Sequence, residues 1–262
     1  MQDFKKGNLP MRHGMSLSHS DSPTMKTEKM RKSKVPYASV IGSIMYAMLC
    51  TRPDVSYALS VTSRYQSCPG DAHWTIVNTI LKYLRRTKDI CLVYGGKDEL
   101  LVEGYTDANF QIDKDDSKPQ SGYVFCLNDG AVSWCSSKQG TVAGSTTEVE
   151  YIAASKVAKE VCWIKKFISE LGVVPSIENP VQLLYDNTGA IAQAKEPITH
   201  HRSKNVLRKY HLIRDIAERG HVSVCKVDTE DNLADPLTKP LTQVKYDKHM
   251  HNVGLKIVCE WR

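Results

Sequence analysis

Four acidic residues stand at positions in the sequence from which their carboxylates could bind a divalent metal ion. They are Asp107, Glu150, Asp186 and Asp235. A carboxylate that folding buries needs a cationic partner, a proton or a metal ion. Carboxylates that reach one place from separate elements suit Mg²⁺, a hard ion that prefers oxygen ligands. Two such ions about 4 Å apart would stabilise both the attacking and the leaving oxygen of a phosphodiester. The chemistry to consider first is therefore metal-assisted cleavage of a phosphodiester.

Glu150 is supported by the pattern of a long helix that we expect over residues 146–171. At about 100° per residue, the face of Glu150 otherwise holds apolar residues: Ala153, Ala154, Val157, Val161, Ile164, Ile168 and Leu171. Glu148 lies about 200° away from this face and stands three residues after Ser145, the spacing of a capping box. We assign Glu148 to the helix cap and Glu150 to the interior, with a structural lysine ion pair as the alternative for Glu150.

The three aspartates are placed by the ends of expected strands. Asp186 follows a short apolar strand at 181–185, and the carboxyl end of an inner strand is a usual site position in open α/β sheets. The alternative is that this residue or its neighbour caps the next helix. Asp107 ends the first expected strand, where an aspartate is often a turn residue. Asp231 precedes Asp235 by one helical turn, and spacing alone leaves the choice between them open.

The composition indicates a packed, intracellular protein. The chain has 262 residues, of which 41% are hydrophobic and 24% charged, and its formal net charge is +6. The eight cysteines form no Cys-x-x-Cys pair, so we expect reduced thiols and no zinc site. The polar first residues argue against a signal peptide, and the longest apolar stretch is too short to span a bilayer. We therefore expect a cytoplasmic or nuclear location and no membrane partner.

Competing catalytic motifs are missing from the sequence. It has no Gly-rich phosphate loop, no His-x-x-x-His pair and no Gly-x-Ser-x-Gly nucleophile elbow. We accordingly expect no small-molecule cofactor.

We expect the chain to be divided into four segments, one of which contains the strands and helices that position the acids. Residues 1–34 are expected to form an extended or disordered arm, 35–97 a small all-helical segment, 98–240 the α/β domain and 241–262 a C-terminal tail. In the α/β domain we expect strands at about 100–106, 122–127, 131–136, 181–185 and 222–227, and helices at 146–171 and 203–219. The Asn-Asp-Gly at 128–130 is typical of a hairpin, because Asn and Gly accept positive φ. Trp134 and Trp163 are assigned to the core.

Short motifs in a characteristic order link these acids to a known family. They are Tyr-Thr-Asp-Ala-Asn at 105–109, Ser-Thr-Thr-Glu-Val-Glu-Tyr at 145–151, Tyr-Asp-Asn at 185–187 and Leu-Ala-Asp-Pro-Leu-Thr-Lys-Pro-Leu at 233–241. Together they resemble the ribonuclease H domain of copia-type LTR retrotransposon Pol polyproteins. Upstream, Gly-Ser-Ile-Met-Tyr at 42–46 and Thr-Arg-Pro-Asp at 51–54 resemble the C-terminal end of the family's reverse transcriptase.

The resemblance implies a fold, a reaction and a set of ligands. The fold is a ribonuclease H-like five-stranded mixed sheet with flanking helices, and the reaction is hydrolysis of the RNA strand of RNA–DNA hybrids. The family's four acids fall on Asp107, Glu150, Asp186 and Asp235, which favours Asp235 over Asp231. They would bind two Mg²⁺ ions, or Mn²⁺ in their place. The partners implied are the hybrid and the rest of a reverse transcriptase polyprotein.

Two sets of residues are candidates for contact with the hybrid. Ser121, Thr146, Thr147 and Asn187 lie next to the acids and could read the 2′-hydroxyl of the RNA strand. Arg202, Lys204 and Arg208 belong to a basic stretch that could bind phosphates. The alternatives are turn and cap chemistry for the first set and a solvated helix face for the second.

Other functions stay open at this point. The main alternative is a catalytically inactive, truncated retrotransposon remnant that at most binds nucleic acid. The family usually reads Asp-Ala-Asp where this chain has Asp-Ala-Asn at 107–109, a departure that fits such a remnant. An integrase would carry its helical glutamate after the second aspartate, whereas Glu150 precedes Asp186. A pure interaction module would leave the buried Glu150 without a purpose.

Overall fold

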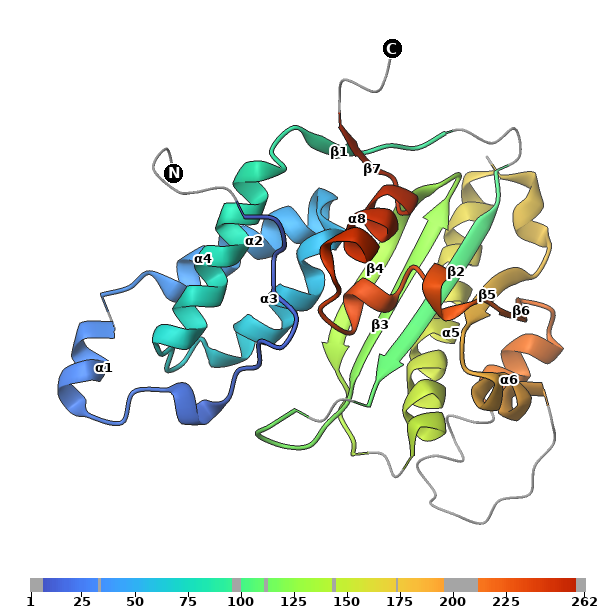
Figure 1. The fold of residues 1–262 in the computed structure, drawn as a ribbon. Coiled ribbons are helices and arrows are strands. Elements are labelled where there is room, and N and C mark those ends of the chain that lie inside the picture. Colours follow the sequence, from blue (N-terminus) through green and yellow to red (C-terminus); the bar gives the residue numbers. More distant parts are fainter. Residues whose placement is uncertain are drawn as a thin grey trace.

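The computed structural model describes residues 7–32, 34–95, 100–110, 113–142, 145–172, 174–195 and 212–257. Figure 1 shows a central sheet with helices on both of its faces. Short elements connect the main ones: η1 (His19–Asp21), η2 (Pro53–Val55), η3 (Ser63–Tyr65), η4 (Pro175–Glu178), η5 (Thr229–Asp231) and η6 (Asp235–Leu237). Within the described ranges, no helix combines the length and apolar character needed to cross a bilayer.

The expected five-stranded mixed sheet is confirmed. Its strands are β2 (Val102–Asn109), β3 (Gln120–Leu127), β4 (Gly130–Lys138), β5 (Val181–Tyr185) and β6 (Val222–Lys226). They lie in the order β4-β3-β2-β5-β6. The first three pair antiparallel, whereas β5 runs parallel to β2 and β6 runs parallel to β5. The carboxyl ends of β2 and β5 therefore meet at one edge of the sheet.

The β3–β4 turn forms at the expected residues for a partly different reason. Asn128 and Asp129 have φ values of 50° and 65°, so these two residues adopt the left-handed conformation of a tight hairpin. Gly130 does not have a positive φ. A Cβ atom there would instead collide with the ring of Tyr94. The glycine is thus needed for close packing, and the sequence-based explanation of its conformation was wrong.

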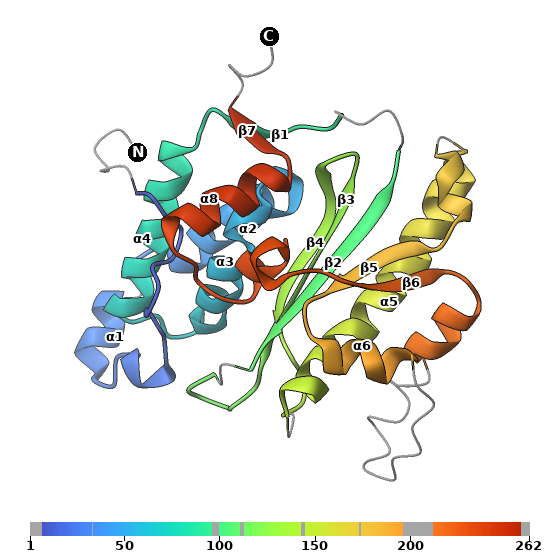
Figure 2. The same cartoon turned by 45° about the vertical axis from the view of Figure 1, so that its right-hand side comes forward.

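One face of the sheet is covered by α5 (Thr146–Leu171), whose expected bounds are confirmed. The backbone N–H of Glu148 donates to the Ser145 hydroxyl at 3.2 Å, and Gly172 ends the helix with a φ of 67°. The apolar face that we expected to cover the sheet is buried from Ala153 to Ile168. Leu171 is an exception with 55% exposure. The α6 helix (Thr188–Lys195) and the helical residues 212–218 lie on the same side as α5 in Figure 2.

The opposite face of the sheet is covered by the helices of the N-terminal part. These are α2 (Tyr37–Thr51), α3 (Ser56–Thr62) and α4 (Asp71–Arg86), and Figure 2 shows them across the sheet from α5. Their apolar residues share one core with Val124 and Ala131 of the sheet. The helices and the sheet are therefore packed together.

The two tryptophans differ in their burial. Trp134 is half-buried against the helical core, and its indole N–H donates to the carbonyl of Met48 at 3.2 Å. Trp163, which we also expected in the core, is 60% exposed and stacks on Phe167 with ring centroids 5.3 Å apart. It lies on the outer face of α5, away from the sheet.

Both ends of the chain are more structured than the sequence indicated. Met11 and Leu17 of the expected arm are buried in the core, and α1 (Lys26–Lys32) follows. The expected C-terminal tail instead contains α8 (Gln243–Asn252) and β7 (Leu255–Ile257), which pairs antiparallel with β1 (Ile90–Leu92). The partners of these segments are remote in sequence, so periodicity gave little indication of them. The division into four domains stays a prediction.

Tyr246 anchors α8 to the helical part. Its hydroxyl donates to the backbone carbonyl of Asp54 at 2.6 Å, and its ring packs edge-to-face on Tyr83 with centroids 6.0 Å apart. The side chain of Asp54 accepts from the Tyr83 hydroxyl at 2.7 Å and pairs with Arg52 at 2.6 Å. Tyr246 therefore joins this buried polar cluster to α8.

We expect Tyr246→Ala to lower the free energy of unfolding by about 3–5 kcal/mol, because it removes a buried ring and a buried hydrogen bond. Urea denaturation measures the change. Val244→Ala on the same helix is the control, since Val244 is 81% exposed and its loss should cost less than about 0.5 kcal/mol. Equal losses in the two variants would contradict the docking of α8.

Candidate metal centre

Three of the four predicted acids meet at the sheet edge. The β2–β5 register pairs Tyr105 with Leu184, so Asp107 and Asp186 each stand two residues further along neighbouring parallel strands. Asp235 reaches the same place from η6. One carboxylate oxygen from each of these three aspartates lies within 4.8 Å of the others. Asp107 and Asp235 are buried, with 3% and 6% exposure, and Asp186 is half-buried.

Glu150 lies next to these three aspartates but is not one of the residues whose ligand atoms lie within 4.8 Å of one another. Its Oε1 accepts a hydrogen bond of 3.3 Å from the backbone N–H of Ala108, the residue after Asp107. Its side chain is buried, as the helical face predicted. Burial, and then the charges of Asp107 and Asp186, raise the pKa of Glu150 to about 9.

The position of Asp235 depends on the approach of η6 to β3. Gly122 is the antiparallel partner of Asp107, and a Cβ atom on it would lie 2.6 Å from Cβ of Leu237. The glycine therefore allows η6 to lie directly over the strand. The Ser136 hydroxyl donates to the carbonyl of Leu237 at 2.6 Å, which fixes η6 on the sheet.

Asp231 and Asp235 lie in different places in the structure. Asp231 is exposed and pairs with Lys248 at 2.7 Å, away from the other acids. Asn232, which lies between them, is fully buried and donates through Nδ2 to the carbonyl of Thr106 at 3.0 Å. This bond ties the loop to β2 and brings Asp235 alongside Asp107.

Lys239 is a residue of the centre that the sequence analysis missed. Its Nζ lies 2.9 Å from Asp235 Oδ1 and 3.8 Å from Asp107 Oδ2. The neighbouring Thr238 donates its hydroxyl to Asp107 Oδ2. The signal available in the sequence was the spacing, since Lys239 follows Asp235 by four residues. A lysine at this spacing is ordinarily assigned to a surface pair.

The charges of the centre oppose one another strongly. Burial raises the pKa of Asp107 to about 7, while Lys239 lowers it and Asp235 raises it further. Burial also raises the pKa of Asp235, against the influence of Lys239. For Lys239, burial lowers the pKa, but Asp107 and Asp235 outweigh it and the pKa is raised overall. The carboxylates thus require positive charge, and oxygen ligands in this arrangement fit a hard divalent cation.

The predicted substrate-binding residues occupy different environments. Ser121 is buried and its hydroxyl accepts from Gln139 Nε2 at 2.6 Å. Asn187 caps α6, because its Oδ1 accepts from the backbone N–H groups of Gly189 and Ala190 at 2.9 and 3.1 Å. Thr146 is exposed in the first turn of α5, and Thr147 beside it is half-buried. Arg202, Lys204 and Arg208 lie outside the described residues.

The sequence comparisons identify the relatives of this chain. It is 41% identical over 256 residues to the retrovirus-related Pol polyprotein from transposon TNT 1-94 of Nicotiana tabacum, a match that covers 97% of this chain and 19% of the relative. It is 35% identical over 219 residues to the corresponding polyprotein from transposon RE2 of Arabidopsis thaliana, covering 84% of this chain and 15% of the relative. The chain is homologous to the Pol polyproteins of copia-type transposons. It spans less than a fifth of the length of either relative.

Other comparisons add two observations about this Pol homologue. It is 42% identical over 130 residues to the secreted RxLR effector protein 161 of Plasmopara viticola, covering 50% of this chain and 92% of that protein. The similarity is thus not limited to full-length polyproteins. No protein-family model matches the chain.

Similar solved structures are ribonucleases H. RNase H1 from Halobacterium salinarum aligns with a TM-score of 0.38 and 17% identity, covering 52% of this chain and 92% of that chain. LC11-RNase H1 in complex with an RNA/DNA hybrid aligns with a TM-score of 0.39 and 16% identity, with the same coverage.

We expect Lys239→Met to tighten the binding of Mn²⁺ by about fivefold or more. The variant removes a unit positive charge close to the oxygens that would bind the metal, which is worth about 1 kcal/mol even at the dielectric constant of water. Isothermal titration calorimetry measures the dissociation constant. Lys248→Met is the control, because Lys248 pairs with the exposed Asp231. Unchanged or weaker binding in Lys239→Met would contradict this account.

In EDTA, we expect the melting temperature to fall as the pH rises from about 5.5 to about 8.5. The raised pKa of Asp107 and of Glu150 means that the folded state retains protons that the unfolded state releases. Stability is therefore greatest at low pH and is lost as the pH rises through these values.

Glu150→Gln should make the fall in melting temperature between these pH values smaller by at least about 3 °C. In a protein of this size, that shift corresponds to a change of about 1 kcal/mol in the free energy of unfolding. Glu148→Gln, on the same helix, should leave the fall unchanged. Parallel pH profiles for the wild type and Glu150→Gln would show that Glu150 is not titrating in this range.

Proposed function

We propose that this protein is a ribonuclease H of retrotransposon origin that hydrolyses the RNA strand of RNA–DNA hybrids with Mg²⁺. The observation that carries the proposal is the meeting of Asp107, Asp186 and Asp235, whose ligand atoms lie within 4.8 Å of one another. Homology to Pol polyproteins and the mixed sheet support a nuclease-type role.

The roles of the acids follow from their positions. Asp107, Asp186 and Asp235 would hold two Mg²⁺ ions, or Mn²⁺ in their place, with Glu150 beside them. When bound, the metal supplies an activated water and neutralises the charge that develops on the phosphate. Thr238 holds the Asp107 carboxylate in place through its hydroxyl, so this ligand is oriented before substrate arrives.

Selection of the RNA strand requires a group that recognises the 2′-hydroxyl. Ser121, Thr146, Thr147 and Asn187 remain our candidates. The cap on α6 fixes the amide of Asn187, which is the residue after Asp186. Ser121 lies on β3 as the antiparallel partner of Ala108.

The wider context of the reaction is part of the same proposal. The hybrid would be bound through phosphate contacts of Arg202, Lys204 and Arg208, and the rest of a reverse transcriptase polyprotein would act beside this chain. An intracellular location, in the cytoplasm or nucleus, follows from that role.

Cleavage of a hybrid with a labelled RNA strand tests the proposal. With Mg²⁺ we expect RNA products ending in 3′-hydroxyl and 5′-phosphate groups, and no cleavage of the matching DNA duplex. Asp186→Asn should lower the rate by about 100-fold or more, because it removes a charged oxygen ligand from the centre.

Glu148→Gln is the matched control and should keep the wild-type rate. If the wild type leaves the RNA strand intact and Asp186→Asn behaves identically, the proposed nuclease activity is contradicted. The alternative, an inactive remnant that at most binds nucleic acid, would then take its place.

A further inference from the structure

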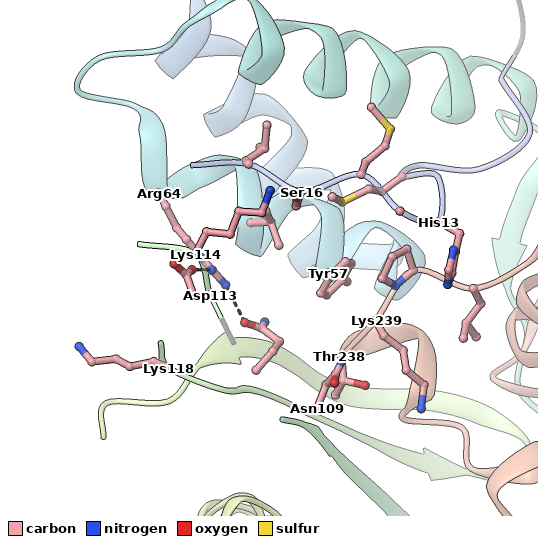
Figure 3. Close-up of a pocket in the computed structure, with 18 of the residues that line it drawn as sticks. His13, Ser16, Tyr57, Arg64, Asn109, Asp113, Lys114, Lys118, Thr238 and Lys239 are labelled. Atoms are coloured by element: carbon pink, nitrogen blue, oxygen red, sulfur yellow. Dashed lines mark hydrogen bonds and ion pairs between the residues drawn. The ribbon is translucent and has the colours of Figure 1, made fainter. Parts of the chain in front are cut away.

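A cavity of about 520 Å³ opens directly beside the metal centre. Its walls come from the segment around residues 11–17, from α3 and η3, from residues 113–120 and from residues 238–245. Figure 3 shows Ser16 and Lys114 on one side of it and Thr238 and Lys239 on the other, with Tyr57 between them. The volume falls in the range of about 300–1,000 Å³ that is usual for ligand pockets.

Cationic side chains are numerous in the lining of this cavity. Five line it, and Asp113 is the one carboxylate among the lining residues that the structure describes. The cations are Arg64, Lys114, Lys118, Lys239 and Lys245. Arg64 pairs with Asp113 and Lys239 with Asp235, whereas Lys118 and Lys245 pair with acids outside the lining, at 3.2 Å from Asp116 and 2.5 Å from Glu230. Among the described residues no acid pairs with Lys114, so a phosphate can bind there without displacing a carboxylate.

Lys239 joins the cavity to the metal centre, because it lines the one and contacts the acids of the other. Two more residues line the cavity and lie close to Asp107. Asn109 follows Asp107 by two residues, and Thr238 donates its hydroxyl to the Asp107 carboxylate. A nucleic-acid strand with one phosphodiester at the carboxylates would carry its neighbouring phosphates toward these cations.

We propose that this cavity binds an unpaired nucleotide of the strand whose phosphodiester lies at the metal centre. A volume of about 520 Å³ has room for a nucleotide and is too small for a duplex. Lys114 and Lys245, on separate walls, would contact its phosphates, and the half-buried ring of Tyr57 offers a surface on which a base can stack. This inference rests on the proposed function, which supplies the strand at the carboxylates.

Fluorescence anisotropy with three labelled hybrids in Ca²⁺ tests the proposal. One hybrid is blunt, and the other two extend the RNA strand by a few unpaired nucleotides, one at the 5′ end and one at the 3′ end. We expect one of the extended hybrids to bind the wild type about tenfold more tightly than the blunt one. Tenfold corresponds to about 1.4 kcal/mol, within the range of about 1–3 kcal/mol for a stacked base.

The double variant Lys114→Ala/Lys245→Ala should lose most of this advantage while binding the blunt hybrid as the wild type does. The affinity of this variant for the extended hybrid should depend less on salt. The slope of the logarithm of the binding constant against the logarithm of the salt concentration should be smaller by about 1.4, because two phosphate contacts with a single strand are lost. The control is Lys159→Ala/Lys166→Ala, which removes two exposed charges from the outer face of α5 and should retain the advantage. Melting temperatures verify that each variant is folded.

The outcomes separate this inference from the proposed function. Equal binding of blunt and extended hybrids by the wild type overturns the inference, and so does an equal loss in the two double variants, which would indicate general electrostatics. Failure to bind any hybrid would instead overturn the proposed function. Binding of the extended hybrid without cleavage would keep the cavity and favour the inactive alternative.

Discussion

Repulsion between buried carboxylates is the constraint on which the site depends. Parallel pairing of β2 with β5 sets Asp107 opposite Asp186, and η6 adds Asp235, so three acids share a space that water cannot fully solvate. Such a group is stable only with a proton or a cation. Lys239 supplies one positive charge at 2.9 Å from Asp235. The arrangement is thus suited to exchanging that charge for a divalent ion.

The helical part and the C-terminal segment act as the support for this centre. Leu233, Leu237 and Leu241 flank Asp235 and belong to the same core as α2, α3 and α4. The segment that carries Asp235 is therefore held between the sheet and the helices, with Gly122 allowing its approach. What the sequence suggested to be a remnant of another domain contributes to the position of Asp235, one of the proposed metal ligands.

The sequence predicted the elements whose pattern is local. The bounds of α5 follow from Ser145, Gly172 and an apolar stripe within one helix, and Glu150 was placed by the same stripe. Lys239 was missed because its spacing from Asp235 is that of an ordinary surface ion pair, and only the fold shows that Asp107 lies beside it. The C-terminal α8 was missed because its partner, the Asp54 carbonyl, is remote in sequence. Periodicity carries no information about such contacts. The site assignments taken from the family resemblance remain proposals about chemistry, although three of the aspartates do meet.

The central claim is that these carboxylates form a metal centre. Anomalous diffraction from crystals soaked in Mn²⁺ tests it most directly. Mn²⁺ scatters X-rays anomalously near its absorption edge, so the ion is located without any assumption about activity. The account predicts anomalous density between the carboxylates of Asp107, Asp186 and Asp235, with Lys239 displaced from Asp235. Ordered carboxylates with Lys239 still in place and no anomalous density between them, at a saturating concentration of Mn²⁺, would contradict it.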